Sequence, residues 1–232
     1  MLPSANSAQL PPHCRPATAY RTPTGNAFFT GAIQAAHLHS PSTESHDNSL
    51  ESHRNQLHPA SQWTIAHWDL PPDQGLAISA AIINGTAKAV SDGSYKSGHS
   101  TAGFILLGSN KEQELEGVNT TPGATLEQSA YRAELSGVAG IASALSCLCK
   151  THDITAGTIT IGLDGEKALY ALAKTATPLP TDASFDLIMD TRHNLANLPI
   201  TIKWNWIKGH QDKKTPKHLL DEWAQLNIRM DK

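Results

Sequence analysis

The chain has 232 residues, which is enough for one domain of roughly 140–200 residues and a tail. Its formal net charge of −3 excludes a chain that is basic throughout, so phosphate would have to meet a local basic patch or metal ions. The three cysteines are too few for a disulfide framework, and the sequence has neither a secretory signal nor an apolar run of about 18 residues. We therefore expect an intracellular protein, of the cytoplasm or nucleus, that does not contact a membrane.

Residues 1–62 have the composition of an unstructured segment. They contain seven of the fourteen prolines and six of the twelve histidines, and they sustain no hydrophobic period of about 2 or 3.6 residues. Such a segment buries too little apolar surface to offset the loss of chain entropy. The sequence therefore predicts a disordered tail or linker over residues 1–62, and then a short connector over residues 63–86 with a helical stretch at 74–83.

A meander of three antiparallel strands on short turns follows, predicted over residues 87–95, 101–107 and 112–119. A long helix comes next, because Thr125-Leu-Glu-Gln128 has the form of a capping box and apolar residues from Tyr131 to Cys149 recur at steps of four and three.

The rest of the chain alternates strands with helices. Strands are predicted over residues 158–164 and 200–207, and helices over 165–176, over 182–198 and from 215 onward. Because the later strands each follow a helix, they should be parallel to one another. The sequence predicts an α/β fold with a mixed five-stranded sheet, three antiparallel strands and then two parallel ones, flanked by helices.

Four acidic residues stand where the pattern is otherwise apolar. Asp92 lies within the first strand, Glu134 borders the apolar line of the long helix, and Asp164 ends an apolar strand. Asp231 continues a largely apolar line of the last helix. Clustered carboxylates repel one another unless cations hold them together, and oxygen ligands without cysteine select Mg²⁺ or Mn²⁺. Two such ions about 4 Å apart would clamp the attacking and leaving oxygens of a phosphodiester.

Residues 87–232 resemble a type 1 ribonuclease H domain, and more narrowly the ribonuclease H region that follows a reverse transcriptase in retroelement polyproteins. The resemblance rests on five motifs in the family's order: Ser91-Asp-Gly-Ser-Tyr95, Tyr131-Arg-Ala-Glu-Leu135, Ile161-Gly-Leu-Asp-Gly165, Trp206-Ile-Lys-Gly-His-Gln-Asp212 and Leu226-Asn-Ile-Arg-Met-Asp231. It implies a ribonuclease H-like fold and a metal-dependent endonuclease that hydrolyses the RNA strand of RNA–DNA hybrids, within a larger reverse transcriptase polyprotein.

The resemblance also implies roles for single residues. The metal ligands, expected to hold two Mg²⁺ or Mn²⁺ ions, would be Asp92, Glu134, Asp164 and Asp231. His210 would be the histidine of a flexible loop that helps to move protons or to release product. Asp221 is a rival for the fourth ligand because it lies closer to His210 in the sequence, but Asn-x-x-x-Asp is the family's pattern and favours Asp231.

The expected substrate contacts match the family less closely. Family members often place small polar residues, commonly Asn, just before the helix glutamate, where they touch the RNA 2′-hydroxyl. This chain has Gln128, Ser129 and Arg132 in that region. We expect these three to bind substrate, together with Ser94 and Lys208.

Two other functions stay open at this point. The family usually continues past the last aspartate, whereas this sequence stops at Lys232, so we expect a truncated C-terminus. A domain of this kind could be a catalytically degenerate module that binds nucleic acid or a protein partner. A strand transferase such as an integrase is disfavoured, because the second acid lies on the helix directly after the meander and because the chain has the Lys-Gly-His loop.

Overall fold

The structure, a computed structural model, describes residues 18–21, 27–30, 48–108, 113–174 and 178–231. The chain divides into two compact units, Met1–Asp47 and Asn48–Lys232. In the first unit, β1 (Thr18–Arg21) pairs in antiparallel fashion with β2 (Ala27–Thr30). The prediction of a wholly disordered tail is therefore wrong at these residues, because strand pairing uses backbone groups that a search for hydrophobic periodicity does not detect.

The tail prediction is also wrong for residues 48–62, which belong to the second unit. Helices α2 (Leu50–Asn55) and α3 (Pro59–Gln62) form there, and the Ser49 hydroxyl accepts a hydrogen bond from the backbone N–H of Ser52 at the start of α2. The side chain of Leu50 is fully buried in the core of this unit. A single buried leucine in so short a helix gives no periodicity by which it could be recognised.

Residues 63–86 belong to the domain and are more than a connector. The 3₁₀ helix η1 (Trp63–Ile65) leads into β3 (His67–Asp69), and α4 (Leu76–Ile83) follows. Strand β3 pairs in antiparallel fashion with β6 (Glu114–Thr120) and so extends one edge of the main sheet. Three residues are too few to show the alternation that identifies a strand in a sequence.

The sheet has six strands among the described residues of this unit, in the order β3-β6-β5-β4-β7-β8. The four strands not yet located are β4 (Ala87–Lys96), β5 (His99–Leu107), β7 (Thr158–Leu163) and β8 (Thr201–Trp206). Strands β4, β5 and β6 are antiparallel neighbours, whereas β7 is parallel to both β4 and β8. This order confirms the predicted α/β class and the mixed sheet of three antiparallel strands followed by two parallel ones, to which β3 adds a sixth strand.

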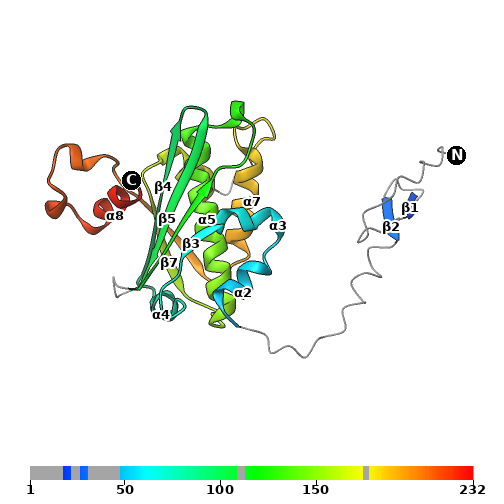
Figure 1. The fold of residues 1–232 in the computed structure, drawn as a ribbon, viewed down its shortest axis with the longest axis horizontal. Coiled ribbons are helices and arrows are strands. Elements are labelled where there is room, and N and C mark those ends of the chain that lie inside the picture. Colours follow the sequence, from blue (N-terminus) through cyan, green and yellow to red (C-terminus); the bar gives the residue numbers. More distant parts are fainter. Residues whose placement is uncertain (1–17, 22–26, 31–47, 109–112, 175–177, 232) are drawn as a thin grey trace. The chain divides into compact units, whose positions relative to one another are not determined.

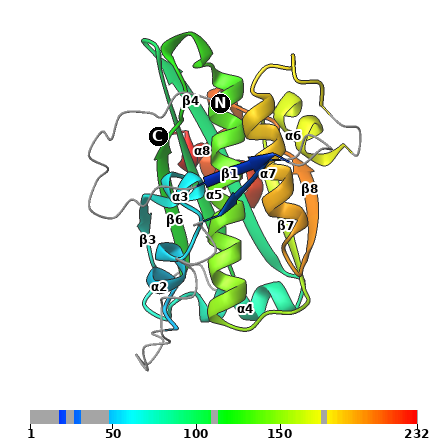
Figure 2. The same cartoon turned by 90° about the vertical axis from the view of Figure 1, so that its right-hand side faces the viewer.

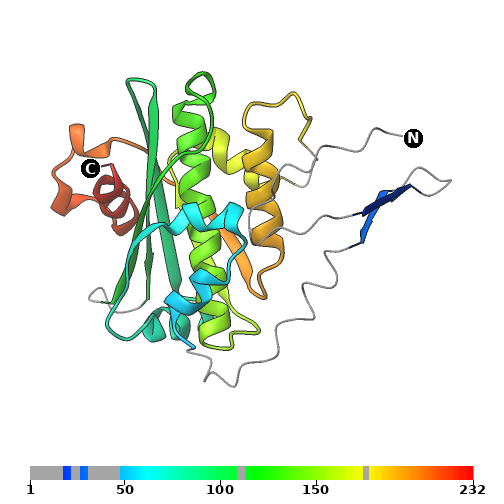
Figure 3. The ribbon, with the colours of Figure 1, turned by 45° about the vertical axis from the view of Figure 1, so that its right-hand side comes forward.

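Helices cover both faces of this sheet (Figure 1 and Figure 3). Helix α5 (Ala130–Thr151) crosses one face with α7 (Phe185–Ala196) beside it, and α8 (Glu222–Met230) lies against the other face. Figure 2 shows α6 (Glu166–Ala173) near α7, on the same face of the sheet as α5. The remaining short 3₁₀ helices are η2 (Thr125–Glu127), η3 (Gln211–Lys213) and η4 (Lys217–Leu219).

Helices α5 and α8 begin about a full turn or more later than predicted. Helix α5 begins after Ser129, whose hydroxyl accepts a hydrogen bond from the backbone N–H of Arg132 at 3.1 Å, while the predicted capping box forms η2. Helix α8 begins after Asp221, whose carboxylate accepts from the backbone N–H of Ala224 at 2.8 Å. In both places a second capping side chain follows the first along the chain, and the local pattern does not decide between them.

The main core lies between α5 and the sheet, and it includes the predicted apolar residues Leu135, Val138 and Leu145. Among the described residues, α5 is also the one helix long and apolar enough to cross a membrane, and 83% of its apolar window is buried inside the protein. This packing fixes the N-terminal turns of α5 against β4, the strand that carries Asp92.

Candidate metal centre

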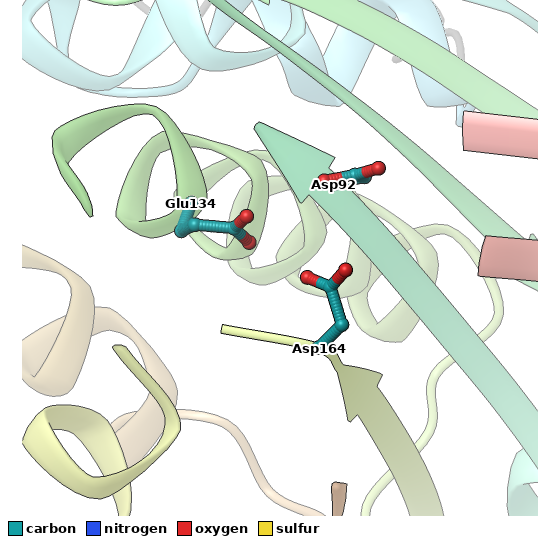
Figure 4. Close-up of side chains that lie close together, drawn as sticks. All are labelled: Asp92, Glu134 and Asp164. Carbon is teal, nitrogen blue, oxygen red and sulfur yellow. The ribbon is translucent and has the colours of Figure 1, made fainter. Parts of the chain in front are cut away.

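Three carboxylates from three different elements converge beside the sheet, and their side chains point toward one another (Figure 4). Asp92 lies on β4, Glu134 lies near the start of α5, and Asp164 directly follows β7. Each offers one oxygen atom that lies within 4.8 Å of the corresponding atoms of the other two. The structure thus brings together three of the four acids that the sequence suggested as metal ligands.

The backbone of β4 approaches α5 very closely at this point. A Cβ atom at Gly93 would lie 2.3 Å from the backbone nitrogen of Glu134, so only glycine leaves room for the contact. The backbone N–H of Gly93 also donates to Asp92 Oδ1 at 2.7 Å. Asp164 joins the pair because β7 is parallel to β4, and side chains at the carboxyl ends of neighbouring parallel strands gather at one edge of the sheet.

Burial and mutual repulsion disfavour the ionised form of these carboxylates. Loss of solvation, with the neighbouring charges of Asp164 and Asp92, raises the pKa of Glu134 to about 9. Burial, with the charges of Asp164 and Asp231, raises the pKa of Asp92 to about 6. In addition, Glu134 Oε2 is buried and has no hydrogen-bond partner among the described residues.

A divalent cation would supply both the charge and the partner that the cluster lacks. All three donors are carboxylate oxygens, which suit Mg²⁺ or Mn²⁺ and do not suit the softer metals. The residues therefore fit the metal that the family resemblance implies.

Asp164 is held in place from several directions. Its Oδ2 accepts a hydrogen bond from Asn227 Nδ2 at 3.2 Å, and its backbone carbonyl accepts one from Trp206 Nε1 at 3.2 Å. A Cβ atom at Gly209 would lie 2.5 Å from Asp164 Oδ2, so the loop that carries His210 passes directly beside this carboxylate. These contacts join α8, β8 and the loop after β8 to the acidic cluster.

Asp231 lies at the C-terminal end of α8, close to the cluster but outside the group of three. Its charge contributes to the raised pKa of Asp92, and its Oδ2 lies 3.7 Å from Nδ1 of His210. Asp221 lies at the other end of α8, where its carboxylate caps the helix. The structure therefore places Asp231, rather than Asp221, beside the three acids.

Arg132, an expected substrate contact, is directed into the protein. Its guanidinium donates to both carboxylate oxygens of Asp186, at 2.8 and 2.6 Å, and to the carbonyl of Pro122 at 2.8 Å. The Arg132 side chain is 5% exposed. This ion pair ties α5 to α7, so the structure does not support the predicted contact between Arg132 and RNA.

The other expected substrate residues are divided between internal and exposed positions. Gln128 donates through its side-chain amide to the carbonyls of Thr121 and Gly123, and Ser129 caps α5. Ser94 and Lys208 are exposed. Of the five expected substrate residues, only Ser94 and Lys208 have side chains that make no hydrogen bond to another described residue.

The sequence interpretation missed a groove of about 630 Å³ between α5, α6 and α7. Two tyrosines in this groove each form a cation–π contact with a lysine. Lys167 Nζ lies 4.5 Å from the ring centre of Tyr131, and Lys174 Nζ lies 5.3 Å from the ring centre of Tyr170. A signal was present for part of it, because Lys167 and Tyr170 are three residues apart and so share one side of α6, and Lys174 directly follows that helix.

No family model matches the chain, and no curated protein does. One similar solved structure is the N-terminal ribonuclease H domain of a Mycobacterium tuberculosis protein, fused to maltose-binding protein, at 10% identity over 63% of this chain and 99% of that chain (TM-score 0.37). Another is a ribonuclease H1 of the archaeon Halobacterium salinarum, at 14% identity over 56% and 90% (TM-score 0.38). A third is the LC11 ribonuclease H1 in complex with an RNA/DNA hybrid, at 13% identity over 62% and 91% (TM-score 0.44). These likenesses are too distant to assign a function, which has to rest on the residues of this chain.

Proposed function

We propose that this chain is a metal-dependent ribonuclease H that hydrolyses the RNA strand of RNA–DNA hybrids with two Mg²⁺ or Mn²⁺ ions. The observation that carries the proposal is the convergence of Asp92, Glu134 and Asp164 in a partly buried cluster, where desolvation and like charges raise the pKa values of Asp92 and Glu134. Each of the three acids belongs to one of the motifs that carry the family resemblance. The three acids also lie on the elements of the sheet and helix where the resemblance places the metal ligands. This agreement favours the proposed function over that of an unrelated metal site.

When bound, the metal ions would polarise the scissile phosphate and favour deprotonation of the attacking water. The protein's own task is to hold the ligand oxygens rigidly, which β4 and α5 do for Asp92 and Glu134, and which Asn227 does for Asp164 through its hydrogen bond. His210 is 58% exposed beside Asp231 and can exchange a proton with the attacking water or the leaving 3′-oxygen.

The groove of Tyr131 and Tyr170 supports a nucleic-acid substrate. Tyr131 comes three residues before Glu134 and Lys167 three residues after Asp164, so residues that line the groove are close neighbours in the sequence of two acids of the cluster. Aromatic rings stack on bases and sugars, and lysines neutralise phosphates. Because the chain as a whole carries a net charge of −3, we propose that the lysines of this groove contribute to the attraction for the hybrid, although Glu166 and Asp182 also line it.

The five motifs also favour a retroelement origin, in which the domain would act as one part of a reverse transcriptase polyprotein. A second candidate function is a degenerate module that binds nucleic acid without cutting it. The internal bonding of Arg132 and Gln128 favours this second candidate, because it removes two expected contacts with RNA.

Digestion of end-labelled substrates separates these functions. The protein should cut the RNA strand of a hybrid in Mg²⁺, leave 5′-phosphate ends, and spare duplex DNA and duplex RNA of the same sequence. Excess EDTA should stop the reaction. Binding of the hybrid without cleavage would favour the degenerate module, and equal cleavage of duplex DNA would favour a different nuclease of the same fold.

A further inference from the structure

Arg229, in the last turn of α8, forms ion pairs with the sheet. Arg229 donates through one terminal nitrogen to Glu114 Oε2 at 2.6 Å and through the other to Glu116 Oε1, and both glutamates lie on β6. Neither glutamate belongs to the acidic cluster, and the proposed chemistry gives Arg229 no task. A guanidinium that bridges two carboxylates in this way fixes the direction of its own backbone more firmly than a single contact would.

The last turn of α8 leads directly to the fourth acid. Met230, the next residue, packs over β5 with its carbonyl oxygen 3.8 Å from the position of a Cβ at Gly103, and Gly103 is the cross-strand partner of Asp92. Asp231 follows at the end of the helix, and it lines the same groove of about 890 Å³ as Asp92 and Arg229. The direction of the last turn therefore decides whether Asp231 faces Asp92.

We propose that Arg229 is a positioning residue, which holds Asp231 toward Asp92 through its ion pairs with Glu114 and Glu116. The inference rests on the proposed function, since it gives Asp231 a place in the metal site. The last turn of a helix has carbonyl groups without intrahelical partners and frays easily. Without Arg229, Asp231 would spend much of its time away from the cluster, and the site would lose one of its four oxygen donors.

The direction in which Arg229→Gln changes the affinity for a divalent cation distinguishes a positioning role from a purely electrostatic one. Arg229→Gln removes a positive charge and leaves two glutamates uncompensated, so a purely electrostatic effect would tighten the binding of a divalent cation. Loss of positioning would weaken the same binding. We expect the affinity for Mn²⁺ to fall about tenfold, the lower end of what loss of a residue supporting a metal ligand causes.

The measurement is calorimetric titration of the full chain with Mn²⁺, which requires no cleavage. Lys88→Gln is the matched control, because Lys88 also ties α8 to the sheet, through Glu222 at the other end of the helix. The Lys88–Glu222 pair is about as exposed as the Arg229–Glu116 pair, at 33% and 38% against 40% and 35%, whereas Glu114 is 18% exposed. The control should leave the Mn²⁺ affinity unchanged, and Arg229→Lys should restore only part of it.

A double-mutant cycle completes the test. Once Asp231→Asn has removed the fourth donor, Arg229→Gln should weaken Mn²⁺ binding no further. If Arg229→Gln does not fold, Glu116→Gln removes one of the two partners and should give an intermediate loss. Unchanged or tighter binding in the arginine variant, or losses that add in the double variant, would overturn the positioning role alone. Wild-type protein that binds no Mn²⁺ would overturn the proposed function as well.

Discussion

The side-chain amide of Asn227 donates to Asp164 Oδ2 at 3.2 Å, which links α8 to the end of β7. Asn227 is 3% exposed, so Asn227→Asp would place a fourth carboxylate inside the acidic cluster with little change of shape. We expect the metal-free variant to lose roughly 1–3 kcal/mol of unfolding free energy, because a hydrogen bond becomes a repulsion between like charges. Mg²⁺ should restore much of the loss, as urea unfolding in EDTA and in Mg²⁺ would show.

Asn194→Asp is the control for that experiment. Asn194 also donates to an aspartate, Asp190 Oδ2 at 3.3 Å, but the pair lies within α7 and outside the acidic cluster. Solvent screens the new charge there, so the loss should be small and should not depend on Mg²⁺. Similar losses for the two variants would mean that the cluster has no special shortage of positive charge.

The raised pKa values of Asp92 and Glu134 predict how stability depends on pH. Their folded-state pKa values, about 6 and about 9, lie above those of the unfolded chain, so the folded protein keeps protons that the unfolded chain releases. This contribution to stability is complete below about pH 4 and is lost as the pH rises toward 9. In EDTA, the thermal midpoint should therefore fall between these pH values, and Mg²⁺ should flatten the fall.

Glu134→Gln tests the origin of that dependence. At pH 8 without metal, the variant should be more stable than the wild type by an amount on the order of a few kcal/mol, because a neutral amide replaces a carboxyl group that is costly to ionise. It should also gain less stability from Mg²⁺. A variant that is less stable than the wild type in EDTA at pH 8 would contradict the account of the cluster.

Leu50 tests whether residues 48–62 are part of the folded domain. Its side chain is fully buried, so Leu50→Ala should cost roughly 2–4 kcal/mol of unfolding free energy in urea. Leu126→Ala is the matched control, because Leu126 is 100% exposed and should change stability little. If both substitutions are neutral, α2 does not dock as the structure shows.

The sequence was sufficient to find the acidic cluster for a physical reason. Carboxylates within apolar strands and at the edge of an apolar helix line are costly unless something compensates them, so Asp92, Glu134 and Asp164 stood out without any view of the fold. Their convergence followed from the alternation of strands and helices. That alternation places Asp164 at the carboxyl end of a parallel strand, the edge of the sheet where ligands bind, and Glu134 near the start of the helix that packs on the sheet.

The features that the sequence did not reveal depend on distant partners or very short elements. Arg132 looked available for RNA, but its partner Asp186 lies on α7, 54 residues away along the chain. Strand β3 forms by pairing with the free edge of β6. The sequence of its three residues alone does not indicate a strand. The start of α8 depended on which of several capping residues the packed helix would use.

The tyrosine–lysine groove predicts where the hybrid binds. In an Asp92→Asn background, where binding can be followed without cleavage, Lys167→Gln together with Lys174→Gln should weaken hybrid binding roughly tenfold at moderate salt. The salt dependence should also become shallower, with a slope smaller by about one to two. The control is Lys150→Gln with Lys203→Gln, two exposed lysines outside the groove. Equal effects of the two pairs would show that the groove has no particular role.

The most direct test of the central claim is the rate of hybrid cleavage by Asp92→Asn in saturating Mg²⁺, measured beside the wild type and beside Asp153→Asn. Asp153 is an exposed carboxylate just beyond the far end of α5, so its variant should cleave at the wild-type rate. Asp92→Asn should fold with an undiminished thermal midpoint in EDTA, because it removes repulsion, and should cleave the RNA strand more than about a hundredfold more slowly. Cleavage by Asp92→Asn at the wild-type rate would contradict the assignment of this cluster as the catalytic metal site.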